Sequence, residues 1–305
     1  MAVRLASIAM AIILGGVSSL ALAGATPSES ESIVVLGDRA EQAGLAADQA
    51  LAITMRPGVD YPLPRRYGPI CVKVFGIAPA FGNLVAERIG GNAKALGLAV
   101  AKPGCEPNLW IGFFRDSKKQ VQQLRKKDPA FFATLDRLDI KRIFKGSDAV
   151  QVWHASEIRS VDGRPIPIIE LEVAGRKIET AYNPQYSGTR LASPIRNDIN
   201  ATILVFDRDQ ANGKTVQQLA DYATFRALAP VQDFAQVAPD AVPSILMLFT
   251  PGAVPPDGLT EFDWAYLSAF YKLDRGAKAS AVHDATRRAM LDGAGQKLRE
   301  KAAAD

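Results

Sequence analysis

The order of apolar and polar positions between residues 70 and 114 predicts a strand, a helix and a second strand. Residues 70–75 (ICVKVF) and 109–114 (LWIGFF) are short apolar runs, rich in β-branched and aromatic side chains, which is typical of strands. Residues 79–97 predict a helix, because apolar side chains recur every three or four positions, at Phe81, Val85, Ile89, Ala93 and Leu96. The short connections indicate a βαβ crossover, in which the two strands are parallel neighbours.

The same patterns predict a longer series of elements in the rest of the chain. Helices are expected over residues 33–56, 117–127, 129–135, 214–228, 261–272 and 280–300, and a short apolar helix or turn over residues 244–249. Strands are expected over residues 149–158, 166–173 and 201–206, the first two on either side of an Asp162-Gly163 turn. Residues 178–198 contain three dipeptides with Pro or Gly that favour turns, so this stretch is expected to be mostly loop.

The helix over residues 261–272 has the most complete start signal. Thr260 can be its N-cap, with Asp263 as the third helical residue, and together they form a capping-box-like pair. Leu259 and Trp264 stand at the spacing of a hydrophobic staple. This helix is therefore expected to begin sharply after Thr260.

Residues 1–23 have the layout of a cleavable secretory signal peptide. Arg4 precedes an apolar run that is densest over residues 8–14, and Ala21-Leu22-Ala23 follows as a small-residue cleavage site. The alternative is an uncleaved anchor, but glycines and serines interrupt the apolar run and no polar flank follows it. We therefore expect cleavage between Ala23 and Gly24 and a periplasmic or secreted protein. No later apolar run approaches ~20 residues, so no transmembrane segment is expected after cleavage.

The chain has two cysteines, Cys71 and Cys105. In an exported protein an isolated pair of cysteines favours a disulfide, and the alternative is two buried thiols. Both cysteines lie where their predicted strands begin. Because parallel neighbours bring these two strand ends together, the disulfide and the βαβ topology support each other.

The predicted elements indicate an α/β to α+β fold, a single mixed-sheet domain with a disulfide-tied βαβ start and a helical C-terminal third. The globular domain is expected over residues 65–292. Residues 24–64 precede it as a leader and an extended, Pro-rich segment, and residues 293–305 follow it as a solvated C-terminal tail.

Composition excludes some classes of protein and leaves a candidate binding surface. The chain is 48% hydrophobic and 22% charged, which fits a packed globule, and its net charge of +4 is too small to indicate nucleic-acid binding. Residues 115–145, however, hold ten Lys and Arg against four Asp. This stretch predicts a patch for an anionic envelope component or an acidic protein, and the alternative is a solvated helix face. The patch residues are Lys118, Lys119, Arg125, Lys126 and Lys127.

Few residues are suited to metal or acid–base chemistry. The two histidines, His154 and His283, are far apart in sequence and there is no H-E-x-x-H motif, so no metal site and no cofactor are expected. His154 is a candidate catalytic base and Asp221 a candidate catalytic carboxylate. The alternatives are a partly buried histidine with a backbone partner and a carboxylate on the edge of the apolar face of its helix.

Residues 207–215 (DRDQANGKT) partly match two kinds of ligand-binding loop. Arg208 stands where a phosphate loop needs its first glycine, so no nucleotide is expected. Asp207 and Asp209 remain as candidate cation ligands, although Gln218 replaces the bidentate glutamate of a calcium loop. The alternative is a polar turn between a strand and a helix, in which Asn212-Gly213 supplies a positive φ.

Six stretches between residues 65 and 292 carry a family resemblance. They are residues 68–74 (GPICVKV), 105–109 (CEPNL), 153–154 (WH), 219–222 (LADY), 244–249 (SILMLF) and 259–267 (LTEFDWAYL). These resemble a group of uncharacterised secreted proteins of alphaproteobacteria. The group has no assigned activity, so the resemblance implies no catalytic residue.

The order of the predicted elements is also similar to that of a metzincin-type peptidase domain. In that likeness, the helix over residues 214–228 takes the place of the active-site helix. It contains no histidine, and Asp221 is its one carboxylate. The resemblance therefore implies a zincin-like shell without zinc.

These observations predict an exported, non-catalytic binding or envelope-associated protein. The alternative is a metal-independent hydrolase whose catalytic groups come together on folding. A pocket with His154 or Asp221 beside a second polar catalytic group would favour the hydrolase. An open basic surface without such a pocket would favour the binding protein.

Overall fold

The computed structural model describes residues 29–56, 61–133, 135, 137–145, 149–181, 193–232 and 241–304. The predicted signal peptide, residues 1–23, lies outside the described residues. The chain divides into a unit of residues 1–37 and a compact unit of residues 38–305, and the fold described below is that of the second unit. None of the helices described is both long enough and apolar enough to cross a bilayer.

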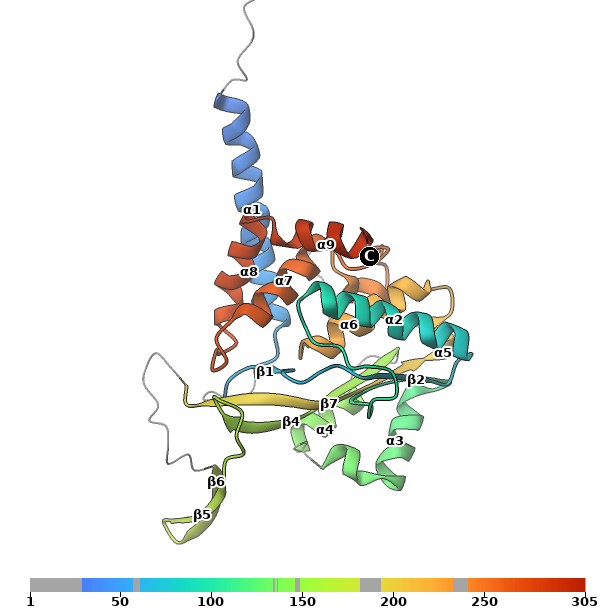
Figure 1. Ribbon diagram of the computed structural model, residues 1–305, viewed down its shortest axis with the longest axis vertical. Coiled ribbons are helices and arrows are strands. Elements are labelled where there is room, and N and C mark those ends of the chain that lie inside the picture. Colours follow the sequence, from blue (N-terminus) through green and yellow to red (C-terminus); the bar gives the residue numbers. More distant parts are fainter. Residues whose placement is uncertain are drawn as a thin grey trace, which may run out of the picture. The chain divides into compact units, whose positions relative to one another are not determined.

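A mixed sheet forms the centre of the fold (Figure 1). Its strands are β1 (Pro64–Arg65), β2 (Val72–Phe75), β3 (Leu109–Phe114), β4 (Val150–Ser160) and β7 (Ile195–Asp207). β1, β7, β3 and β2 run parallel, and β4 pairs antiparallel with β7. The long β7 therefore holds β4 along one side and both β1 and β3 along the other. The predicted mixed sheet is confirmed.

The predicted βαβ crossover is present as β2, α2 (Pro79–Ala95) and β3. Val72 pairs with Leu109 at the start of the two parallel strands. The Cys71–Cys105 disulfide spans 6.1 Å between Cα atoms beside this start. The Asn108 side chain adds a link, because its Oδ1 accepts a hydrogen bond from the Cys71 amide at 3.0 Å. The disulfide and the parallel topology are thus both confirmed.

Helices cover both faces of the sheet, because alternate side chains of a strand point to opposite faces. Leu204 and Phe206 of β7 pack with α2, α6 (Val216–Leu228) and α7 (Glu261–Lys272). Ile203 and Val205 pack with the elements of the other face. Those elements are α3 (Ser117–Lys127), the 3₁₀ turn η1 (Pro129–Phe132) and α4 (Arg137–Lys145). Figure 1 shows α2 and α6 on one side of the sheet and α3 and α4 on the other.

The C-terminal third is helical, as predicted. η2 (Ile245–Phe249), α7, α8 (Ala281–Leu291) and α9 (Ala294–Ala304) follow one another. Thr260 and Asp263 form the capping box that starts α7. The helix expected over residues 280–300 is broken at Gly293, where φ is +64°. Its second half, α9, packs Leu298 and Ala302 on the core, so the expected solvated tail is a helix with one exposed side.

The segment before the sheet belongs to the same core. The predicted Ala-rich helix is α1 (Glu29–Ile53), and its side chains Ala43, Ala46, Ala47 and Ala50 are fully buried. Arg65 is buried as well, and its Nη1 donates to the carbonyls of Phe270 at 3.1 Å and Leu273 at 2.6 Å. A guanidinium at this place stabilises the C-terminus of α7, whose last carbonyls lack helical partners.

Three predictions about strands and helices need correction. β7 begins at Ile195 rather than at residue 201, because its polar first half gains hydrogen bonds from β1 and β4. β6 (Arg176–Ala181) lies partly in the expected loop and pairs with β5 (Ile168–Val173), forming a hairpin separate from the main sheet. α4 was not predicted, although its apolar residues Ile140, Ile143 and Phe144 have helical spacing.

Candidate functional site

A cavity of about 640 Å³ lies along the edge strand β4. Its walls come from β4, α4, the end of α6 and residues 55, 56, 61, 64 and 230–232. The polar side chains that line it are Arg56, Asp139, Arg142, Gln151, His154, Ser156, Asn197, Arg226 and Gln232. Most of the other lining residues are apolar. The cavity therefore combines an apolar wall with a small set of polar groups, as small-molecule sites do.

The pairing of β4 with β7 places the polar groups of the sheet. Val152, His154 and Ser156 alternate along β4 and therefore share one face. His154 stands directly opposite Thr202 of β7. A register shift between Ala155 and Ser156 leaves one extra residue in β7, and Asn197 beyond it lines the same cavity.

A short chain of hydrogen bonds joins His154 to Arg66 through Thr202. Arg66 Nη2 donates to Thr202 Oγ1 at 2.9 Å, and Thr202 Oγ1 lies 3.0 Å from His154 Nδ1. Because arginine only donates, the Thr202 hydroxyl keeps its own hydrogen for His154 Nδ1. We assign the remaining ring proton to Nε2, which makes Nε2–H the donor left for a ligand.

The surroundings of His154 keep its ring uncharged. Burial, and after it the positive charges of Arg66, Arg226 and Arg142, together lower the pKa of His154 to about 3. His154 is thus a neutral hydrogen-bond donor near pH 7.

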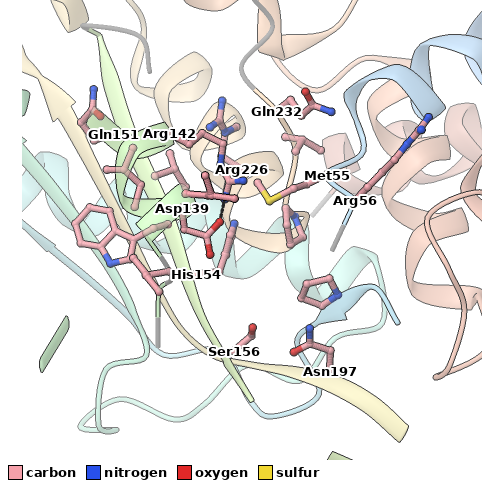
Figure 2. Close-up of a pocket in the computed structure, with 18 of the residues that line it drawn as sticks. Met55, Arg56, Asp139, Arg142, Gln151, His154, Ser156, Asn197, Arg226 and Gln232 are labelled. Atoms are coloured by element: carbon pink, nitrogen blue, oxygen red, sulfur yellow. Dashed lines mark hydrogen bonds and ion pairs between the residues drawn. The ribbon is translucent and has the colours of Figure 1, made fainter. Parts of the chain in front are cut away.

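Arginines give the cavity a positive charge. Arg142 of α4 forms an ion pair with Asp139, which is the one carboxylate among the described lining residues. Arg226 of α6 is 6% exposed, and its Nη1 donates to the hydroxyl of Tyr222 at 3.3 Å. Figure 2 shows Arg142, Arg226, Asp139 and His154 near one another, with Arg56 on another wall. Three arginines against one aspartate leave a net positive site.

Two further buried groups next to the cavity lack partners within the described chain. The Oδ1 atom of Asn197 is buried and accepts no hydrogen bond there. The Nε of Arg66 is also without a partner, although Arg66 is only 3% exposed. Buried polar atoms are normally hydrogen-bonded, so the Asn197 carbonyl on the cavity wall indicates a place for a donor from a ligand or water.

Asp221, the second catalytic candidate, lies away from this cavity. Its carboxylate is fully buried and accepts four hydrogen bonds. Arg88 donates through Nε at 2.8 Å and Nη2 at 3.0 Å, Asn92 through Nδ2 at 2.7 Å, and Leu259 through its amide at 3.0 Å. These bonds link α2, α6 and the chain before α7, so Asp221 has a structural role.

The candidate cation ligands act as a helix cap. Asp207 Oδ1 accepts from the amides of Asp209 and Gln210 at the start of α5 (Arg208–Ala211), and its Oδ2 accepts from the Ser117 amide. Gly213 has a φ of +78°, as the turn interpretation predicted. Nowhere in the described ranges do three His, Cys, Asp or Glu side chains meet in a way that could hold a metal ion.

The predicted basic patch lies on α3. Lys119, Arg125, Lys126 and Lys127 are exposed there, and Lys118 is half-buried. None of the five lines the cavity along β4. The same basic stretch does reach that cavity through Arg142 of α4.

Sequence reasoning found His154 but missed the arginines around it. Arg226 interrupts an otherwise apolar helix face, and a charge in such a place is a signal that could have been used. Arg56, Arg66 and Asn197 stand in segments without periodicity, so only folding brings them to His154. No protein family, curated protein or solved structure matches this chain, so the geometry of the site carries the functional argument.

Proposed function

We propose that this chain is an exported, non-catalytic binding protein that holds an organic anion, a carboxylate or a phosphate, in the cavity along β4. The observation that carries the proposal is the charge of the cavity: Arg56, Arg142 and Arg226 line it against the single described carboxylate of Asp139. Guanidinium groups bind carboxylates and phosphates through directed, charge-assisted hydrogen bonds.

The other lining groups suit an anion that carries an organic body. His154 supplies a neutral donor beside the arginines, and the Asn197 carbonyl needs a donor from the ligand. Apolar side chains such as Met55, Leu138 and Val231 supply contact area. Burial of that area favours a ligand with an aliphatic or aromatic part over a simple inorganic ion.

Calorimetric titration of the mature chain with benzoate, and with its uncharged analogue benzamide, tests this proposal. Benzoate should bind and benzamide should bind at least tenfold more weakly. R142Q, at a partly exposed position on the cavity wall, should weaken benzoate binding severalfold. K126Q removes the same charge from the exposed face of α3 and is the matched control.

Two results of the titration would contradict the proposal. Equal affinity for benzoate and benzamide would remove the role of charge. A loss of affinity in K126Q as large as that in R142Q would assign the anion to the basic surface of α3 instead.

A metal-independent hydrolase is the second candidate, favoured by His154 and Ser156 on one face of the same cavity. Two features disfavour it. A histidine with a pKa of about 3 is a poor base near neutral pH. Its Nδ1 also contacts a threonine, where a catalytic triad has a carboxylate. If p-nitrophenyl acetate is hydrolysed by the wild type and not by S156A or H154A, the hydrolase is the correct function.

Export is part of the proposal and has a separate test. The Cys71–Cys105 disulfide supports it, because such bonds persist in oxidising compartments. Mass spectrometry of the protein from cells should find an N-terminus near Gly24, and retention of Met1 would contradict cleavage. The zincin-like ancestry also remains a proposal, supported by the position of α6 after the sheet, although α6 contains no histidine.

A further inference from the structure

A second cavity, of about 430 Å³, opens where the parallel strands end. Ile77 follows β2, Arg115 follows β3, and residues 208–214 follow β7, so three connections from neighbouring strands meet there. α2 and α6 form its sides. In open α/β sheets, ligands bind outside the carboxyl ends of parallel strands, because the connecting loops leave a crevice there. This cavity shares no lining residue with the one along β4.

The floor of the second cavity is apolar. Val85 of α2, Phe113 of β3 and Leu219 of α6 line it, and Phe113 is buried. Phe81 stands at the rim and is 54% exposed, which is high for a phenylalanine. An apolar hollow of this size with an exposed aromatic rim is typical of a ligand-binding groove.

The rim of the second cavity is cationic. Arg115, Arg208 and Lys214 line it, and Asp209 is the one acid among its described lining residues. Throughout the described ranges, the guanidinium groups of Arg115 and Arg208 and the ammonium group of Lys214 form no hydrogen bond or ion pair. Three cations without a partner among the described residues, beside an apolar floor, complement a molecule with a negative head and a hydrocarbon body.

We propose that this second cavity binds an amphiphilic anion of the fatty-acid type, with its chain on the Val85–Phe113–Leu219 floor and its head at Arg115, Arg208 and Lys214. The segment that resembles a phosphate loop thus contributes side-chain charges from Arg208 and Lys214 rather than a backbone cradle. The proposal does not rest on the function of the cavity along β4.

Titration calorimetry of the mature chain with decanoate, and with decanol as the uncharged analogue, tests it. Decanoate should bind at least tenfold more tightly than decanol. The R208Q/K214Q variant, with changes at one exposed and one half-buried position, should lose at least tenfold in decanoate affinity. K126Q/K127Q removes two charges from the exposed side of α3 and should stay within twofold of the wild type. Methyl resonances of Val85 and Leu219 should shift on addition of decanoate.

The remaining outcomes overturn the proposal. They are the absence of decanoate binding, equal binding of decanol, and an unchanged affinity in R208Q/K214Q. A loss of decanoate binding in R142Q, with R208Q/K214Q unaffected, would place the ligand in the cavity along β4. Conversely, R208Q/K214Q should leave benzoate binding intact. The proposals for the two cavities can therefore be contradicted independently of each other.

Discussion

At the scale of single residues, a row of three hydrogen-bonded side chains sets which donor faces a ligand in the cavity along β4. The row consists of Arg66, Thr202 and His154. Arg66 donates to Thr202, and the Thr202 hydroxyl is left to donate to His154 Nδ1. Because arginine stays protonated at any ordinary pH, Arg66 remains the donor to Thr202. His154 therefore presents Nε2–H as a neutral donor between positive charges.

The free energy of unfolding is expected to fall as the pH is lowered from 6.5 to 3. In the unfolded chain, His154 takes up a proton near pH 6.5, whereas burial and three arginines hold its pKa at about 3 in the folded protein. In this window the unfolded state binds more protons, so stability is full above pH 6.5 and is lost at up to ~1.4 kcal/mol per pH unit towards pH 3.

Urea denaturation across this pH range measures the effect. H154Q should lose less stability than the wild type as the pH falls, since the glutamine does not titrate. An NMR titration of the imidazole should show His154 still neutral at pH 5 in the folded protein. Equal slopes for the two proteins, or a His154 that protonates near pH 6.5 while folded, would contradict the assignment.

At the scale of elements, Asp221 holds α2 and α6 together. One fully buried carboxylate accepts four hydrogen bonds, from Arg88, Asn92 and the Leu259 amide. The Asp221 Oδ2 atom lies 2.5 Å from where a Cβ on Gly258 would stand. The chain can approach α6 here because position 258 has no side chain.

D221A is expected to destabilise the protein by ~3–5 kcal/mol, because it leaves buried donors and the Arg88 charge without their acceptor. Chemical denaturation of the mature chain measures the change. D209A removes an exposed carboxylate and should shift the unfolding free energy by less than ~0.5 kcal/mol. A D221A protein as stable as the wild type would rule out this structural role.

At the scale of the whole molecule, the two cavities differ in how their positive charge meets solvent. Arg226 of the cavity along β4 is buried, although Arg56 and Arg142 on its walls are exposed. At the ends of the parallel strands, Arg115 and Arg208 are exposed and Lys214 is half-buried, so the second cavity has no fully buried cation among its described lining residues. Exposed charges are screened by salt, and buried ones much less.

Raising the salt concentration should therefore weaken the binding of decanoate more than the binding of benzoate. At low salt both anions gain from the positive charge, but at ~1 M salt the screening length is only ~3 Å and the exposed rim loses most of its effect. Calorimetric titrations with both ligands over a series of NaCl concentrations measure this. If benzoate proves the more salt-sensitive ligand, the buried Arg226 does not bind it.

Local patterns were enough to predict several elements to the residue. β3, α3 and α7 begin and end where expected, since each has a complete apolar run, helical periodicity or cap of its own. Local patterns did not predict the first half of β7. Its residues Arg196, Asn197 and Asp198 are polar, and their strand conformation comes from pairing with β1 and β4, which are distant in sequence.

The sequence by itself determined the βαβ start, the disulfide and the capped helix, because each depends on contacts near in the chain or on one pair of cysteines. It also singled out His154. Only the tertiary structure decided that Arg66, Arg142, Arg226 and Asn197 surround or adjoin His154 while Asp221 does not. These groups come from five separate stretches of chain, and no local pattern encodes a site whose members meet only when β4, β7, α4 and α6 have packed together.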